Sequence, residues 1–237
     1  MKTTPITEQD ISSELGRTIK SPIRILNLQD LGINSEAFVD YFSPLFEELD
    51  WDEYDPRRLR VEYLKNAFKQ EKAAIHEQFK AYFTGQVTVA VFNQWIDRLS
   101  PSQKVAFAAI QPWRRRSVAK FEIEEKGDRF YLKRVPVEAF EQAVDEADFR
   151  SWPRVFSESP THHVEHGLFH QFIIKIFFLV RTLQPEVKRA SFTAHFMSVK
   201  ATAATPGDNS PEGAHEDGAA YIAVSYTHLT LPTTPYV

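Results

Sequence analysis

The stretch Ser117–Val135, SVAKFEIEEKGDRFYLKRV, decides the fold class of this chain. Its two halves are short and extended in pattern, and Gly127-Asp128 stands between them. A Gly-Asp pair between two such segments is typical of a β-hairpin turn. The stretch therefore predicts two antiparallel strands, and it lies just after Trp113, where the character of the sequence changes.

The sequence before this point, from Ser35 to Ile110, has helical patterns. Ser35 is the expected cap of a first helix with one apolar face, and Pro44 should kink or divide that helix. Asp55-Pro56 has the form of a second helix start, with a capping residue followed by proline at the first helical position. Residues 35–112 are thus predicted to be packing helices without chemistry of their own, behind a loose arm of residues 1–34.

The sequence after the hairpin continues with one helix and further strands. Residues 165–183 are helical in length but apolar nearly all round, so this helix should be buried on a sheet. Residues 190–202 are predicted to form a strand, residues 205–213 a loop, and a further strand should begin at Ala219. Because helices come first and strands later, we predict an α+β fold with a mainly antiparallel sheet.

The composition limits the function classes. A chain of 237 residues with net charge -4 and pI near 6.1 has no global field that attracts nucleic acid. The absence of cysteine excludes disulfides, thiolate metal sites and a cysteine nucleophile. The strongest apolar run, Phe172–Val180, is far shorter than the roughly 20 residues that cross a bilayer. We therefore expect a cytoplasmic enzyme without a nucleic-acid or membrane partner.

The residues with the clearest chemistry are His215 and Asp217, within Pro211–Gly218, PEGAHEDG. Two residues apart on an extended chain, their side chains point to the same side, and Glu216 points to the other. A neutral imidazole and a carboxylate suit Fe(II), and one more histidine would complete a facial triad. The alternative is a polar loop that leads into a strand.

Three segments together resemble a known enzyme family. They are Pro112–Ile123 (PWRRRSVAKFEI), His195–Thr202 (HFMSVKAT) and the PEGAHEDG segment, and their order and spacing are similar to those of the 2-oxoglutarate/iron dioxygenases that include bacterial hydroxylases of free amino acids such as isoleucine. The resemblance implies a double-stranded β-helix (jelly roll) over residues 113–223. It also implies Fe(II) held by His215 and Asp217, 2-oxoglutarate as cosubstrate, O2, and a small-molecule substrate such as an amino acid. The alternative function is a non-catalytic jelly-roll protein that binds a metal or ligand.

The resemblance also implies a second histidine ligand on a later strand, with an arginine near it that binds 2-oxoglutarate. No Lys or Arg follows Asp217, and His228 lies too close to that residue to be the distal ligand. Residues 224–233, VSYTHLTLPT, resemble the translation of a transposon-end sequencing adapter. We therefore expect residues 224–237 to be a non-native tail, the jelly roll to be incomplete, and this exact polypeptide to fold poorly and to be inactive.

Other candidate residues keep two interpretations each. His162, His166 and His170 would stack on one face of a helix and could bind zinc, although histidines near a helix start are more often caps or core residues. Arg114–Arg116 could meet an anion, but salt bridges are the more frequent use of such a triplet. His195 could face the iron site or pack in the core.

Overall fold

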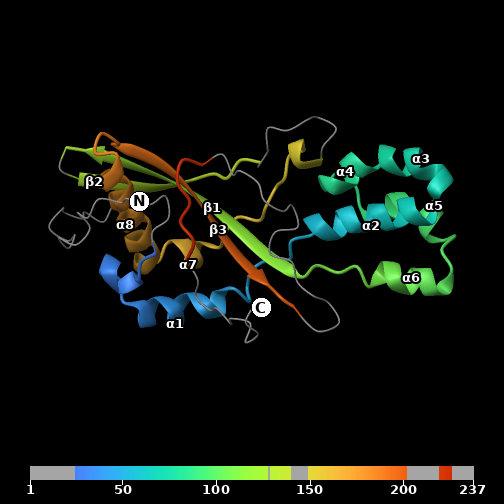
Figure 1. Cartoon of the computed structure of the whole chain (residues 1–237), viewed down its shortest axis with the longest axis horizontal. Helices are drawn as coiled ribbons and strands as arrows, with labels where there is room; N and C mark the ends of the chain where they lie inside the picture. The colour runs from blue at the N-terminus through green and yellow to red at the C-terminus, as the bar shows by residue number, and fades with distance from the viewer. Residues whose placement is uncertain (1–24, 128, 140–148, 202–218, 226–237) are drawn as a thin grey trace, which may run out of the picture.

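The computed structural model describes residues 25–127, 129–139, 149–201 and 219–225 (Figure 1). Within these ranges the helices precede the strands, except for one 3-10 helix and two α-helices that stand between the hairpin and the last strand. The α-helices are α1 (Ser35–Leu45), α2 (Tyr54–Ala67), α3 (Lys72–Glu77), α4 (Phe79–Phe83), α5 (Asn93–Ile96), α6 (Pro101–Ala108), α7 (Thr161–Val164) and α8 (Gly167–Leu183). The strands are β1 (Arg114–Lys126), β2 (Arg129–Val135) and β3 (Arg189–Val199), and the 3-10 helices are η3 (Leu28–Leu31), η4 (Lys69–Glu71), η5 (Val89–Phe92) and η6 (Phe149–Ser151).

The strands form one antiparallel sheet in the order β2-β1-β3. The predicted hairpin is confirmed, because β1 and β2 pair from Lys126↔Arg129 onward. Gly127 has φ +66°, a left-handed conformation that glycine adopts without steric cost. The α+β class with an antiparallel sheet is thus confirmed for the described part of the chain.

The edge of β1 on the β2 side is covered by more than one segment. Beyond the end of β2, the Val118 amide donates to the Ser157 carbonyl (2.9 Å), and the Ser159 amide donates to the Val118 carbonyl (2.8 Å). Further along, the Asp52 amide donates to the Arg114 carbonyl at 2.8 Å. Two segments more than 100 residues apart in sequence are thereby aligned side by side along one strand.

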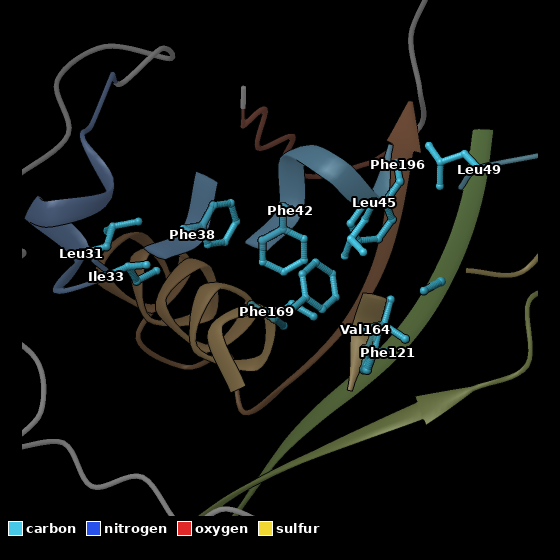
Figure 2. Close-up of a cluster of buried hydrophobic side chains, with 12 residues drawn as sticks. Leu31, Ile33, Phe38, Phe42, Leu45, Leu49, Phe121, Val164, Phe169 and Phe196 are labelled. Carbon is cyan, nitrogen blue, oxygen red and sulfur yellow. The ribbon is translucent and has the colours of Figure 1, made fainter. Parts of the chain in front are cut away.

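Helices α1 and α8 pack on one face of the sheet, as predicted for the long apolar helix. Figure 2 shows Phe38 and Phe42 of α1 and Phe169 of α8 turned toward one another, with Phe121 and Phe196 of the strands beside them. Phe42 and Phe121 are each 1% exposed, so this is a closed aromatic core. The end of the predicted arm also takes part, since Leu31 and Ile33 are buried in the same cluster.

Helices α2 to α6 build a second apolar core beside the first. They gather at one end of the sheet (Figure 1), around side chains such as Leu64, Ile75 and Phe92, which are fully buried. Trp152, from the segment after η6, closes this core with its ring 5.0 Å from that of Phe79. The helices of the first half thus have a packing role of their own.

A buried ion-pair cluster joins the second core to the sheet. Arg114, the first residue of β1, donates from Nε to Asp52 Oδ2 (3.1 Å) and from Nη2 to Asp55 Oδ2 (2.8 Å). All three side chains are almost fully buried. The Tyr54 amide, at the start of α2, donates to the other oxygen of Asp52 at 3.0 Å.

Three local predictions were wrong. The cap of α1 is Asn34, whose Oδ1 accepts from the Ala37 amide at 2.9 Å, and Ser35 is already helical. Asp55 does not cap α2, because Tyr54 precedes it in the helix and its carboxylate binds Arg114. The chain from Ala219 to Ser225 is exposed and forms no strand, since no other described strand pairs with it.

Among the described residues, no helix is long and apolar enough to cross a membrane.

Candidate functional site

The two predicted iron ligands, His215 and Asp217, lie within residues 202–218 and so outside the described residues. His228 lies outside them as well. The donor chemistry of the pair still fits iron, since one imidazole and one carboxylate are two of the three groups of a facial triad. The assignment of His215 and Asp217 therefore stays a prediction.

His195 lies on β3, directly opposite Val118 of β1. Its neighbour Phe196 points into the aromatic core, so the alternation of the strand turns His195 to the other face of the sheet. The side chain is exposed, and its ring lies edge-on to Phe156 with centroids 6.3 Å apart. Two roles were predicted for His195, facing the iron site or packing in the core, and the prediction of core packing is wrong.

The predicted stack of His162, His166 and His170 on one helix face does not form. The helix breaks at His166, which is extended (φ -79°, ψ 141°) and caps α8 by accepting at Nδ1 from the Leu168 amide (3.3 Å). The His166 ring also stacks on Tyr41 with centroids 3.8 Å apart. The capping interpretation is thus confirmed for His166, while His170 lies edge-on to a core phenylalanine.

Two histidines of this segment instead converge on Glu48. His162 Nε2 lies 2.7 Å from Glu48 Oε2, and His163 Nε2 lies 3.4 Å from the same oxygen. The three possible ligand atoms lie within 4.8 Å of one another. We call Glu48, His162 and His163 the Glu-His-His cluster.

The edge of β1 explains why these residues meet. Glu48 stands shortly before the segment 50–52 that pairs with β1, and α7 begins directly after the segment 157–159 that pairs further along the same edge. Tyr41 of α1 adds a cross-link, because its hydroxyl donates to the His162 carbonyl at 2.6 Å.

Two members of the cluster, Glu48 and His163, have lowered pKa values. The hydrogen bond from His162, followed by that from His163, lowers the pKa of the Glu48 carboxyl. Burial lowers the pKa of His163, whose side chain is 0% exposed, and the hydrogen bond to Glu48 opposes this effect only in part. At neutral pH the cluster therefore presents an ionised carboxylate and a neutral buried imidazole at His163.

The arginine triplet makes salt bridges, as predicted. Arg114 binds the two buried aspartates, and Arg116 Nε lies 3.6 Å from Asp52 Oδ2. Arg115 donates to the Glu47 carbonyl and lies over the Trp51 ring at 4.4 Å. Each of the three guanidinium groups therefore contacts a partner within the protein itself.

Glu48 was missed by the sequence reasoning. It lies in an acidic run, FEELDWDEYD (residues 46–55), in which Glu47, Glu48 and Asp52 have similar local surroundings. The fold gives each of them a different partner. Glu47 Oε2 lies 2.7 Å from Lys200 Nζ, and Asp52 binds Arg114. Only the pairing along β1 distinguishes the residue that meets the histidines.

A family comparison covers the second half of the chain. The family model described as 2OG-Fe dioxygenase matches residues 94–229, which is more than half of the 237 residues. Neither the curated proteins nor the solved structures contain a match. The family implies Fe(II), 2-oxoglutarate and O2, and a small-molecule substrate. The chain therefore belongs to the 2OG-Fe dioxygenase family.

Proposed function

We propose that this protein is an Fe(II)- and 2-oxoglutarate-dependent oxygenase that hydroxylates a free amino acid. The observation that carries the proposal is the family match over residues 94–229, which includes His215 and Asp217. When bound, Fe(II) with 2-oxoglutarate supplies the oxidising power: O2 gives one oxygen atom to the substrate as hydroxyl and the other to 2-oxoglutarate, which becomes succinate and CO2.

His215 and Asp217 would hold the iron with one imidazole nitrogen and one carboxylate oxygen. If this segment is extended, residues two apart would point to the same side and Glu216 to the other. The assignment therefore predicts that Glu216 tolerates substitution while its two neighbours do not.

For the fold we propose the jelly roll, with the sheet β2-β1-β3 as part of one wall. The distribution of side chains supports this. Helices α1 and α8 cover one face, where Phe121 and Phe196 are buried. The other face carries polar residues such as Thr193 and His195, which are exposed among the described residues. A polar inner face suits a barrel that encloses a small polar ligand.

Succinate formation tests the proposed activity. The gene product, whose sequence we predict to differ from this chain after residue 223, is supplied with Fe(II), 2-oxoglutarate and each of the common amino acids. Succinate and the hydroxylated product are measured by mass spectrometry. We expect succinate to rise with at least one amino acid, and the rise to be lost in His215→Ala and Asp217→Ala but kept in Glu216→Gln. The 237-residue chain is assayed in parallel. Because we predict from the sequence that this chain is an inactive fragment, we expect no turnover from it.

Two outcomes would count against the proposal. Equal succinate formation in wild type and Asp217→Ala would remove the iron assignment. Binding of Fe(II) and 2-oxoglutarate without any amino-acid-dependent succinate, in the natural gene product, would favour the non-catalytic binder over the hydroxylase.

A further inference from the structure

The Glu-His-His cluster has the ligand chemistry of a metal site, and it lies apart in sequence from the predicted iron ligands His215 and Asp217. Two imidazoles and one carboxylate converge within 4.8 Å. Glu48 lies outside residues 94–229, which match the family model. His162 and His163 lie inside them, but well before His215 and Asp217 in the sequence. We propose that Glu48, His162 and His163 bind a second divalent transition-metal cation, Zn²⁺ in the first instance, separate from the catalytic iron.

The two distances from Glu48 are close to those that zinc requires, and the two histidines lie within 4.8 Å of each other in their ligand atoms. A tetrahedral Zn²⁺ with bonds of about 2.0–2.2 Å places its ligand atoms about 3.3 Å apart. His163 Nε2 and Glu48 Oε2 are already 3.4 Å apart. The 2.7 Å between His162 Nε2 and the same oxygen has to widen by a few tenths of an ångström. His162 is 57% exposed and Glu48 is 49% exposed, so both side chains are free to make this change.

The protein holds the buried ligand in place before any cation arrives. His163 is 0% exposed, and its ring lies 6.1 Å from that of Phe196 in the aromatic core. Its neighbour Val164 is fully buried in the same core and anchors α7 to the sheet (Figure 2). A fixed imidazole lowers the entropic cost of binding, because only the two exposed ligands have to be ordered.

The exposed side of the cluster gives a cation its entry path and its remaining ligands. Glu48 and His162 reach solvent, so water can fill the fourth position of a three-ligand zinc site. His163 Nδ1, which would carry the ring proton, is buried with no hydrogen-bond partner among the described residues. Because this ring lacks the usual outer partner, we expect weaker binding than at a four-ligand structural zinc site.

The bound cation would act as a clamp. Glu48 follows α1 and the histidines belong to α7, so a shared metal ties together two segments that are 114 residues apart at Glu48 and His162. A ligand that binds only the folded state stabilises that state by mass action. Metal binding at the cluster would act on stability, and it does not depend on the proposed hydroxylase activity.

Metal binding and thermal unfolding test the proposal. Chelator-treated protein is titrated with Zn²⁺ by calorimetry, its unfolding temperature is measured with Zn²⁺ and with Mg²⁺, and Co²⁺ absorption reports the ligand geometry. Glu48→Gln and His162→Gln remove exposed ligands and should fold. Glu47→Gln is the matched control, because the adjacent carboxylate binds Lys200 and neither histidine. Asp217→Asn separates this site from the iron site.

We expect Zn²⁺, but not Mg²⁺, to raise the unfolding temperature of wild type, Glu47→Gln and Asp217→Asn alike. Loss of an outer-shell partner weakens metal binding by about 10- to 100-fold, so loss of a ligand should weaken it by about 100-fold or more. Unchanged Zn²⁺ affinity in Glu48→Gln and His162→Gln would overturn the proposal, as would the absence of Zn²⁺ binding in wild type. Loss of the Zn²⁺ effect in Asp217→Asn alone would assign the binding to the iron ligands instead.

Discussion

Replacing Arg114 with methionine should remove the buried ion pairs that join the helical core to the sheet. The guanidinium is 2% exposed and binds two carboxylates that are themselves 3% and 5% exposed in their side chains. Methionine has a similar length but no charge, so the change mainly removes the ion pairs. Asp55 loses its 2.8 Å partner, while Asp52 keeps Arg116 at 3.6 Å.

The size of the effect follows from the burial. Breaking a buried ion pair by removing one partner costs about 3–5 kcal/mol, because a charge is left in a medium of low dielectric constant. Lys126→Met is the matched control at the other end of the same strand, since Lys126 and its partner Glu124 are 61% and 35% exposed. Such an exposed pair contributes about 0–1 kcal/mol.

Urea unfolding at pH 7, followed by circular dichroism, measures the free energy of unfolding of both variants. A double-mutant cycle with Asp55→Asn then separates the ion pair from lost packing, since the second substitution should cost much less once Arg114 is gone. If Arg114→Met and Lys126→Met lose the same free energy of unfolding, the buried cluster does not stabilise this junction and the reasoning is refuted.

Three further predictions concern a buried position of α8, the hydrogen bonds of Glu71 and the hairpin. Phe177→Ala, at a fully buried position of α8, should cost about 3–5 kcal/mol of unfolding free energy in the same urea assay, and a loss below about 1 kcal/mol would contradict the packing. The hydrogen bonds from Arg98 and then Trp95 lower the pKa of Glu71 below its ordinary value of 4.5, so their stabilisation is complete above about pH 4.5 and is lost as the pH falls through the lower folded-state pKa. The difference in urea midpoint between wild type and Glu71→Gln should therefore shrink below that pH, and a pH-independent difference would be inconsistent with it. Gly127→Val should cost about 1–2 kcal/mol because of its φ of +66°, and Gly127→Asn clearly less, with equal losses arguing against backbone strain.

Local patterns predicted the elements whose own residues determine them. The hairpin followed from alternation around Gly127, and α8 followed from an apolar run of helical length that ends before Pro185. The cap of α1 was misplaced by one residue because Asn34 and Ser35 are both good capping residues. The pattern at Asp55 was misinterpreted for another reason: its carboxylate has a tertiary partner on β1, and a buried ion pair outweighs a helix-capping preference.

The Glu-His-His cluster shows the limit of sequence reasoning more clearly. Periodicity placed His162, His166 and His170 on one helix face, and that prediction failed because His166 adopts an extended conformation and caps a new helix. The actual partner, Glu48, is separated from His162 by 114 residues. No local pattern carries that information, since the contact depends on two segments that pair with the same edge of β1.

The contacts of Arg114 with Asp52 and Asp55 also change the role that we assign to the helical first half of the chain. The family match begins at residue 94, yet the buried acidic partners of Arg114 are Asp52 and Asp55, and both precede it. The segment around Asp52 also pairs with the backbone of β1 itself. In a chain reduced to the matched residues, the guanidinium of Arg114 at the start of β1 would therefore lose both carboxylates. The edge of β1 would also lose the segment around Asp52 that pairs with it. Because a buried charge without its partner costs several kcal/mol, and a domain is stable by only about 5–15 kcal/mol, the helices before residue 94 belong to the folding unit of the oxygenase domain.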